Sequence, residues 1–231
     1  TSLILLSLTL NTFAANWSQW RGPNRDGVNP EKGLANQWPE AGPKLLYKAT
    51  GVGVGFSSVV IADGTLYTLG DLGDACYLFA LDLKGKHKWK TRVGDPKGHR
   101  GYPGPRSTPT VAGDHVYCLG QHSDLVCITT AGKEVWRVNL QNDFGGKMMS
   151  GWRWGESPLV GGGSVIIAPG GRNGAVIALN AKTGKQAWRC EDWQDSAGYS
   201  SLLVRGIGGI KQYIQLTGSS VAGIDASNGK L

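Results

Sequence analysis

Two tryptophans that flank an arginine, close to a carboxylate, form the segment of this chain best suited to bind a ligand. Trp152, Arg153 and Trp154 are followed two residues later by Glu156. Indole rings stack on flat groups and a guanidinium pairs with anions, so these residues could hold a flat anionic ligand. The same residues could instead pack between sheets around an arginine–glutamate pair. The sequence leaves both interpretations open.

Several familiar catalytic patterns are missing from the chain. The four histidines lack the spacing from a cysteine pair that zinc sites use, and there is no Cys-x-x-Cys motif. No Gly-x-Ser-x-Gly motif supplies a serine nucleophile. The glycines from Gly51 to Gly55 lack the spacing of a nucleotide-binding loop, and a strand rather than a helix is expected after them. Zinc, hydrolase and nucleotide chemistry therefore have no support.

The elements that would position the candidate residues repeat along the chain. Four stretches carry the same order of features: a Ser or Thr before an apolar run, a turn, a second run closed by glycine, a third run, and a Gly-Lys turn. The closing glycines are about 50 residues apart, and so are the Gly-Lys turns. The closing glycines are Gly70, Gly120, Gly170 and Gly218, and the Gly-Lys turns begin at Gly85, Gly132, Gly184 and Gly229.

Each repeat is predicted to form a four-stranded antiparallel sheet, because its short β-rich runs are separated by Gly, Asp or Asn turns. Such units are typical of β-propellers, in which about four to eight blades surround a channel. The first three repeats place Trp89, Trp136 and Trp188 after the Gly-Lys turn. We expect these indoles to fill the space between blades, because a blade cannot bury both faces alone. The predicted fold class is an all-β propeller, with about four blades of a seven- or eight-bladed whole in residues 55–231.

The propeller geometry also selects the residues that would face a ligand. Loops entering the innermost strand of each blade gather at one mouth of the channel, so the residues just before these strands are the expected contacts. They are Phe56, Arg106, Glu156 and Tyr199. With the tryptophan-rich segment beside them, the predicted ligand-binding residues are Arg106, Trp152, Arg153, Trp154, Glu156 and Tyr199. No residue is assigned as a catalytic group or a metal ligand.

Composition supports a packed chain. Of 231 residues, 40% are hydrophobic and 18% charged, which argues against disorder and against a coiled coil. The net charge is +7, but the basic residues are scattered singly and in pairs, so no nucleic-acid partner is expected.

The first residues predict export. Residues 1–15 combine a short apolar run with small residues and resemble the end of a secretory signal peptide that lacks its true start, cleaved after Ala14 or Ala15. A buried N-terminal strand is the alternative. The run is too short for a stable membrane span, so a periplasmic or secreted protein is expected. Exported chains can form disulfides, but the pairing of the four cysteines stays open between a bridge and buried thiols. The four are Cys76, Cys118, Cys127 and Cys190.

Residues 16–54 are predicted to form a lead-in with a closing strand. Gly42 to Tyr47 has the spacing of a fourth strand without the three that should precede it. The last repeat, in turn, stops at Leu231 before a fourth strand of its own. We therefore expect the sequence to be cut at its C-terminus, and Leu45–Tyr47 to complete a later blade, which would remove an exposed sheet edge.

Two stretches resemble a known family. The pattern Ala-x-Asn-x-x-Thr-Gly-Lys-x-x-Trp from Ala178 to Trp188 resembles the repeat of pyrroloquinoline-quinone (PQQ)-type β-propellers. The segment from Trp17 to Gly27 is similar to the lead-in of exported PQQ-binding-like repeat proteins. The second repeat departs from the pattern, because Thr129 stands where other repeats have Asp or Asn.

This resemblance implies two different activities. Quinoprotein dehydrogenases of the family hold PQQ with Ca²⁺ and use a general-base Asp and often an adjacent Cys pair, whereas the outer-membrane-protein assembly factor binds protein segments without a cofactor. In this sequence only Glu156 stands at the expected mouth as a carboxylate, and no base is identifiable. We therefore predict an exported, non-catalytic module that binds a protein or small ligand at the mouth. The alternative is a dehydrogenase that uses PQQ and calcium to oxidise an alcohol or sugar.

Overall fold

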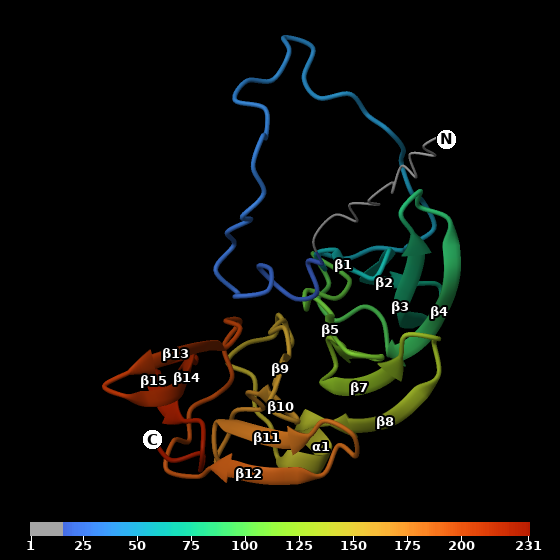
Figure 1. The fold of residues 1–231 in the computed structure, drawn as a ribbon. Coiled ribbons are helices and arrows are strands. Elements are labelled where there is room, and N and C mark those ends of the chain that lie inside the picture. The colour runs from blue at the N-terminus through green and yellow to red at the C-terminus, as the bar shows by residue number, and fades with distance from the viewer. Residues whose placement is uncertain (1–15) are drawn as a thin grey trace, which may run out of the picture.

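Four antiparallel sheets follow one another around a common centre in the computed structural model, which describes residues 16–231 (Figure 1). Blade 1 holds β1 (Val60–Ala62), β2 (Thr65–Leu72), β3 (Ala75–Asp82) and β4 (His87–Gly94). Blade 2 holds β5 (Thr110–Ala112), β6 (His115–Leu119), β7 (Asp124–Thr129) and β8 (Glu134–Asn139). Blade 3 holds β9 (Leu159–Gly161), β10 (Ser164–Ile167), β11 (Val176–Asn180) and β12 (Gln186–Cys190), and blade 4 holds β13 (Leu203–Ile207), β14 (Ile210–Leu216) and β15 (Val221–Asp225).

Strand order within each sheet equals sequence order, so each blade is a simple meander. β1, β5, β9 and β13 are the first strands of their sheets, and the three-residue strands β1, β5 and β9 face the centre in Figure 1. The predicted all-β class is confirmed, and the four sheets are blades that cover part of a propeller. The predicted signal peptide, residues 1–15, lies outside the described residues.

Turn chemistry explains why the sheets form where they do. Both central residues of the β1–β2 turn, Asp63 and Gly64, have positive φ, which the two-residue hairpin turn requires. One side chain stabilises the turn before the fourth strand. In blade 1, Asp82 Oδ1 accepts the backbone N–H groups of Lys84 and Lys86, at 2.9 Å each. Thr129 replaces the acidic residue in blade 2, and its Oγ1 accepts the Lys133 N–H at 3.1 Å. The threonine therefore stabilises the same turn, although it differs from the residue of the other repeats.

Each indole of a fourth strand packs on a glycine of the following blade. A Cβ placed on Gly132 would stand 2.8 Å from the ring of Trp89, so any larger residue would displace the indole. Trp136 meets Gly184 and Trp188 meets Gly229 in the same way. The indole Nε1 of Trp89 donates to the Thr130 carbonyl, and that of Trp136 donates to the Ala181 carbonyl. The predicted role of these tryptophans between blades agrees with this geometry.

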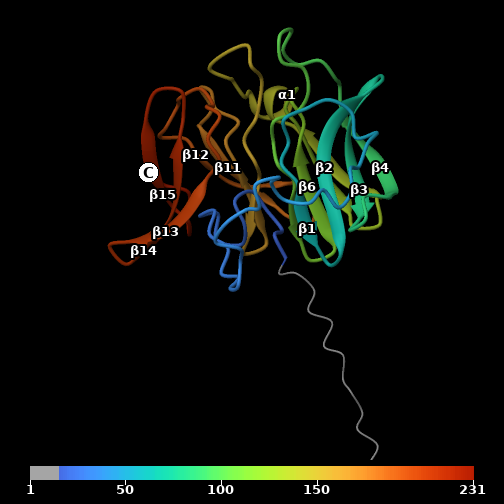
Figure 2. The ribbon, with the colours of Figure 1, turned by 90° about the horizontal axis from the view of Figure 1, so that it is seen from above.

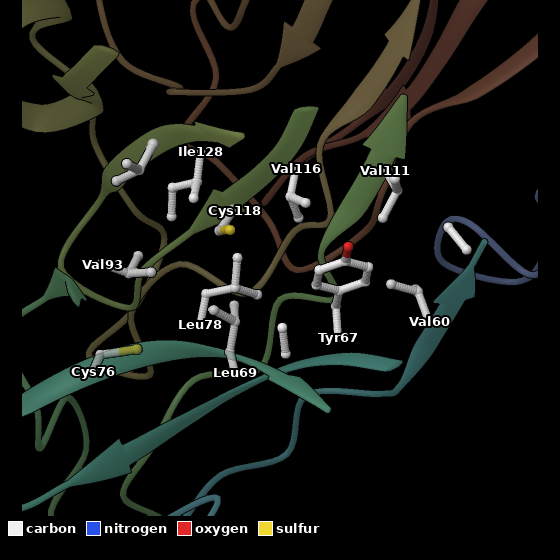
Figure 3. Close-up of a cluster of buried hydrophobic side chains, with 13 residues drawn as sticks. Val60, Tyr67, Leu69, Cys76, Leu78, Val93, Val111, Val116, Cys118 and Ile128 are labelled. Carbon is white, nitrogen blue, oxygen red and sulfur yellow. The ribbon is translucent and has the colours of Figure 1, made fainter. Parts of the chain in front are cut away.

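Apolar side chains fill the remaining space between blades. Figure 3 shows the cluster between blades 1 and 2, in which Leu69 and Leu78 face Val116, Cys118 and Ile128. All four cysteines are buried and free, so the thiol alternative holds in this structure. One short helix, α1 (Leu140–Phe144), connects blade 2 to blade 3 and was not expected from the sequence. Among residues 16–231, no helix is long and apolar enough to cross a bilayer.

The predicted closing strand is not paired in this structure. Leu45 and Leu46 are exposed, and no strand is assigned between residues 42 and 53. Tyr47, however, lies 3.0 Å from a Cβ placed on Gly85, which repeats the aromatic-on-glycine contact of the three tryptophans. Pairing of Leu45–Tyr47 with a further blade therefore stays a prediction.

Replacing Trp136 by alanine should destabilise the protein strongly, because it empties the space between blades 2 and 3 and removes one of the two donors to the Ala181 carbonyl, the other being the Tyr117 hydroxyl. The expected loss in unfolding free energy is about 3–5 kcal/mol, measured by denaturant unfolding. Trp38→Ala is the matched control, because that indole is 70% exposed. Equal losses in the two variants would contradict the role assigned to the indole.

Candidate functional site

A cavity of about 570 Å³ lies where the innermost strands begin, and we call it the mouth cavity. Its volume is in the range of pockets that hold small molecules or side-chain groups of a partner. The side chains around it are mostly aromatic or hydroxylic, with a single charged residue. The lining residues are Trp20, Phe56, Ser58, Arg106, Thr108, Trp152, Gly155, Ser157, Tyr199, Ser200 and Ser201.

The lining follows a pattern of alternating residues that repeats in every blade. Phe56 and Ser58 line the cavity from blade 1, and Arg106 and Thr108 do so from blade 2. Blade 3 contributes Gly155 and Ser157, and blade 4 contributes Tyr199 and Ser201. Alternate residues of an extended chain point the same way, so each pair faces the centre. In blade 4 the intervening Ser200 lines the cavity as well.

Hydrogen bonds between inner strands hold this register. Ser157 Oγ accepts the Thr108 N–H at 2.9 Å, and Ser201 Oγ accepts the Ser157 N–H at 2.9 Å. Thr110 Oγ1 donates to the Pro158 carbonyl at 2.7 Å. Blades 2, 3 and 4 are therefore connected at the cavity by buried side-chain bonds, which makes the lining a rigid part of the fold.

Arg106 is the charged group of the mouth cavity. Its guanidinium carbon lies 5.4 Å from the ring centre of Phe56 and 5.4 Å from that of Trp152. The guanidinium donates to the carbonyls of Gly104 and Tyr102, at 3.3 and 2.9 Å. Within the described residues it forms no ion pair, so its charge is available to an anion.

A stack of rings extends from the cavity onto its rim. The His99 ring lies parallel to that of Trp152, with centres 4.1 Å apart, and Tyr102 stacks on the same indole at 5.2 Å. Arg153 Nε donates to the Gly98 carbonyl, which joins the two loops. Tyr102 and Trp152 both remain exposed, at 53% and 39%. The rim is therefore an ordered aromatic surface open to solvent.

Three of the six predicted site residues line the mouth cavity. Arg106, Trp152 and Tyr199 are brought together there, and the hydroxyl of Tyr199 forms a hydrogen bond with Ser150 Oγ. Gly155 lies between Arg106 and Tyr199, since a Cβ there would stand 3.2 Å from the Cβ of Arg106 and 3.9 Å from the ring of Tyr199. Because Gly155 has no side chain, the space beside it stays open and forms part of the cavity.

The other three predicted residues lie elsewhere. Trp154 is 3% exposed and belongs to the apolar cluster between blades 2 and 3. Arg153 faces a smaller, separate pocket with Lys147 and Ser150. Glu156 is 1% exposed and its Oε2 accepts the Ala168 N–H at 3.0 Å, while its Oε1 has no hydrogen-bond partner in the described part of the chain. Burial raises the pKa of Glu156 to about 8, and the Ala168 N–H and the charge of Arg25 oppose this only in part.

The residues missed by sequence reasoning are Trp20, His99 and Tyr102. Trp20 lines the cavity although it belongs to the lead-in, and the other two come from the long loop between β4 and β5. A weak signal existed for the loop, because His99, Tyr102 and Arg106 are spaced closely before an inner strand. Nothing in the spacing of the lead-in indicated that Trp20 reaches the centre.

The donor set around the mouth cavity does not fit a calcium-held quinone. Ca²⁺ takes six to eight oxygen ligands, usually including several carboxylates. Residues 16–231 contain no cluster of three His, Cys, Asp or Glu side chains that could hold a metal ion. Glu156 is absent from the lining of the cavity, and its pKa near 8 favours the protonated form at neutral pH. This part of the chain therefore does not supply the ligands.

The fold and the repeated lining define a β-propeller of PQQ-type repeats. Residues 75–231 match the sequence profile of the family described as "Outer membrane protein assembly factor BamB". The match covers more than half of the chain, so the chain belongs to this family of BamB-like PQQ repeats.

Two relatives are similar to parts of this chain. The chain is 32% identical over 157 residues to the serine/threonine-protein kinase AfsK of Streptomyces griseus, covering 66% of this chain and 18% of that protein. It is 32% identical over 114 residues to the outer membrane protein assembly factor BamB of Xanthomonas campestris, covering 49% of this chain and 27% of that protein. It therefore spans less than a third of the length of either relative.

The fold is also found in a solved enzyme structure. The quinohemoprotein alcohol dehydrogenase from Comamonas testosteroni superimposes with a TM-score of 0.53 at 18% identity, over 77% of this chain and 34% of that one. At this identity the likeness concerns the fold alone.

Glu156→Gln should make stability less sensitive to pH. The folded-state pKa of about 8 lies above the value of 4.5 for a free carboxyl, so the folded state binds more protons between these values. Stability therefore falls as pH rises through this range in the natural protein. We expect the Gln variant to gain stability at pH 8 relative to the natural protein and to gain little at pH 4.5. Thermal unfolding at both pH values measures this, and an equal effect at both would contradict the assigned protonation state.

Proposed function

We propose that this protein is an exported, non-catalytic binding module whose mouth cavity and aromatic rim hold an aromatic, anionic group of a protein segment or small ligand. The observation that carries the proposal is the position of Arg106. Within residues 16–231 its guanidinium forms no ion pair, and it lies 5.4 Å from the ring centres of both Phe56 and Trp152 at the wall of an open cavity. Guanidinium groups bind carboxylates, and indole and phenyl faces bind flat rings. One place on the cavity wall can therefore bind both an anionic group and an aromatic ring.

The shape of the rim supports a protein segment as the source of that group. His99, Tyr102 and Trp152 continue the aromatic surface beyond the cavity, with ring centres 4.1 to 6.1 Å apart. Exposed aromatic residues are enriched at the centres of protein interfaces. Membership of the BamB-like family also supports a protein segment as the ligand, since the name of the Xanthomonas relative refers to assembly of outer membrane proteins. Export to the periplasm is part of the proposal and rests on residues 1–15.

Short fluorescent peptides test this function directly. We expect peptides that combine aromatic and acidic residues to bind the full chain, and versions without the acids or without the rings to bind at least tenfold more weakly. Arg106→Gln should weaken binding by about tenfold or more, because a charged hydrogen bond is lost. Fluorescence anisotropy gives the dissociation constants.

The matched control is Lys90→Gln, which removes the same charge from the outer strand β4, where Lys90 lies over the ring of Tyr77. We expect no change in binding for this variant. An equal effect of the two substitutions, or equal binding of peptides with and without acids, would overturn the proposal.

The dehydrogenase alternative is tested by titrating the full-length protein with PQQ and Ca²⁺ while following absorbance and dye reduction. We expect neither a quinone spectrum on the protein nor turnover with alcohols or sugars, because residues 16–231 lack the calcium ligands described above. Turnover that is lost in Glu156→Ala would contradict the non-catalytic proposal.

A further inference from the structure

The N-terminal part of the lead-in crosses the inner strands of three blades. We call residues 16–27 the channel segment. Trp17 exchanges both backbone hydrogen bonds with Ile61 of β1, at 2.8 and 3.0 Å, and the Ser18 carbonyl accepts the Val111 N–H of β5 at 2.7 Å. In Figure 2 this blue segment lies on the side of the blades opposite α1. It therefore contacts the innermost strands of two blades before it reaches the third.

Arg25 attaches the channel segment to blade 3. Its guanidinium donates to the carbonyls of Ser157 and Pro158, at 2.9 and 3.1 Å, and the residue is 3% exposed. Burial lowers the pKa of Arg25 to about 10, which leaves the group charged at neutral pH. The Glu156 carboxylate opposes this lowering in part when it is ionised, above its pKa of about 8. A buried cation bound to two carbonyls is costly to remove, so this contact holds the segment in place.

The turn between these anchors presents Trp20 to the mouth cavity. The Gly22 N–H donates to the Gln19 carbonyl and the Arg25 N–H to the Gly22 carbonyl, each at 3.0 Å. Gly22 has a φ of +80°, and a Cβ there would stand 2.6 Å from the Trp17 ring, so only glycine fits. The guanidinium carbon of Arg25 lies 5.3 Å from the centre of the Trp20 ring, which fixes the indole from one side.

We propose that the channel segment is the floor of the mouth cavity and that Trp20 is a ligand-contacting residue on which the aromatic part of the bound group lies. Arg25 is then a positioning residue that acts through Trp20. This inference rests on the proposed function, because it assigns a further contact to the same site. It also assigns specificity, since an indole floor favours flat rings over branched aliphatic groups.

The polar groups of the lining agree with this division of roles. Ser157 and Ser201 use their hydroxyl oxygens to accept backbone N–H groups of the neighbouring blade. The guanidinium of Arg106 is consequently the charged contact for the ligand, and Trp20 is an aromatic contact from a separate part of the chain. A ring that carries an anionic substituent can touch both.

The probe is 1-anilinonaphthalene-8-sulfonate, a flat aromatic anion, titrated into the full chain. We expect Trp20→Ala to weaken its binding by about tenfold, whereas Trp20→Phe should stay within about threefold. Trp20→Leu keeps the apolar volume without an aromatic face and should resemble the Ala variant, which provides a second test if Ala disturbs folding. Trp38→Ala, on an exposed indole, should have no effect.

Arg25→Gln tests the positioning role with a structural readout. We expect faster hydrogen exchange at the backbone amides of positions 22, 25 and 27, no change in β2 and β3, and weaker probe binding. Unchanged exchange in the channel segment would overturn the role of Arg25.

The outcomes separate this inference from the proposed function. If the probe binds and Arg106→Gln weakens it while Trp20→Ala and Trp20→Leu do not, the floor assignment is wrong and the proposed function stands. If Arg106→Gln has no effect on either the probe or the peptides, the proposed function fails, and this inference fails with it. Competition between the peptides and the probe shows whether a peptide side chain occupies the same place as the small molecule.

Discussion

The packing of one aromatic ring on one glycine of the next blade is the contact on which the rest of the structure depends. Trp89, Trp136 and Trp188 each make it. A four-stranded sheet with two apolar faces is not stable alone, so every blade requires its neighbour. The contact fixes the angle and spacing of successive blades, and thereby brings the short inner strands to one centre. The mouth cavity exists because four separate segments of the chain, one from each blade, meet there.

The same constraint explains why the site consists of loops on a rigid support. The inner strands of blades 2, 3 and 4 are joined by serine and threonine hydroxyls, and Arg106 is the charged side chain of the cavity lining. Binding chemistry is therefore concentrated in the loops that precede those strands, where Arg106, Trp152 and Tyr199 lie. The channel segment adds Trp20 from below, so the site combines a repeated framework with contacts that occur once.

The sequence predicted the repeats but only part of the site. The glycine and tryptophan spacing was sufficient to find the blades, because each packing contact requires a particular residue size. Glu156 was expected at the mouth, since it stands just before the Ser157-Pro158 start of an inner strand, as Arg106 stands before Ser107. The repeat is one residue shorter at this point, so Gly155 faces the cavity and Glu156 faces the interior. In an extended chain, a shift of one residue reverses the direction in which a side chain points. The five-residue helix α1 was too short to produce a helical period, and the position of Trp20 depends on distant contacts.

A crystal structure of the full chain with a bound acidic, aromatic peptide would test the central claim most directly. The account predicts a carboxylate against the guanidinium of Arg106 and an aromatic ring in the mouth cavity between Trp152 and Trp20. A peptide bound at another place, such as the edge of β15, with the cavity unchanged, would contradict it.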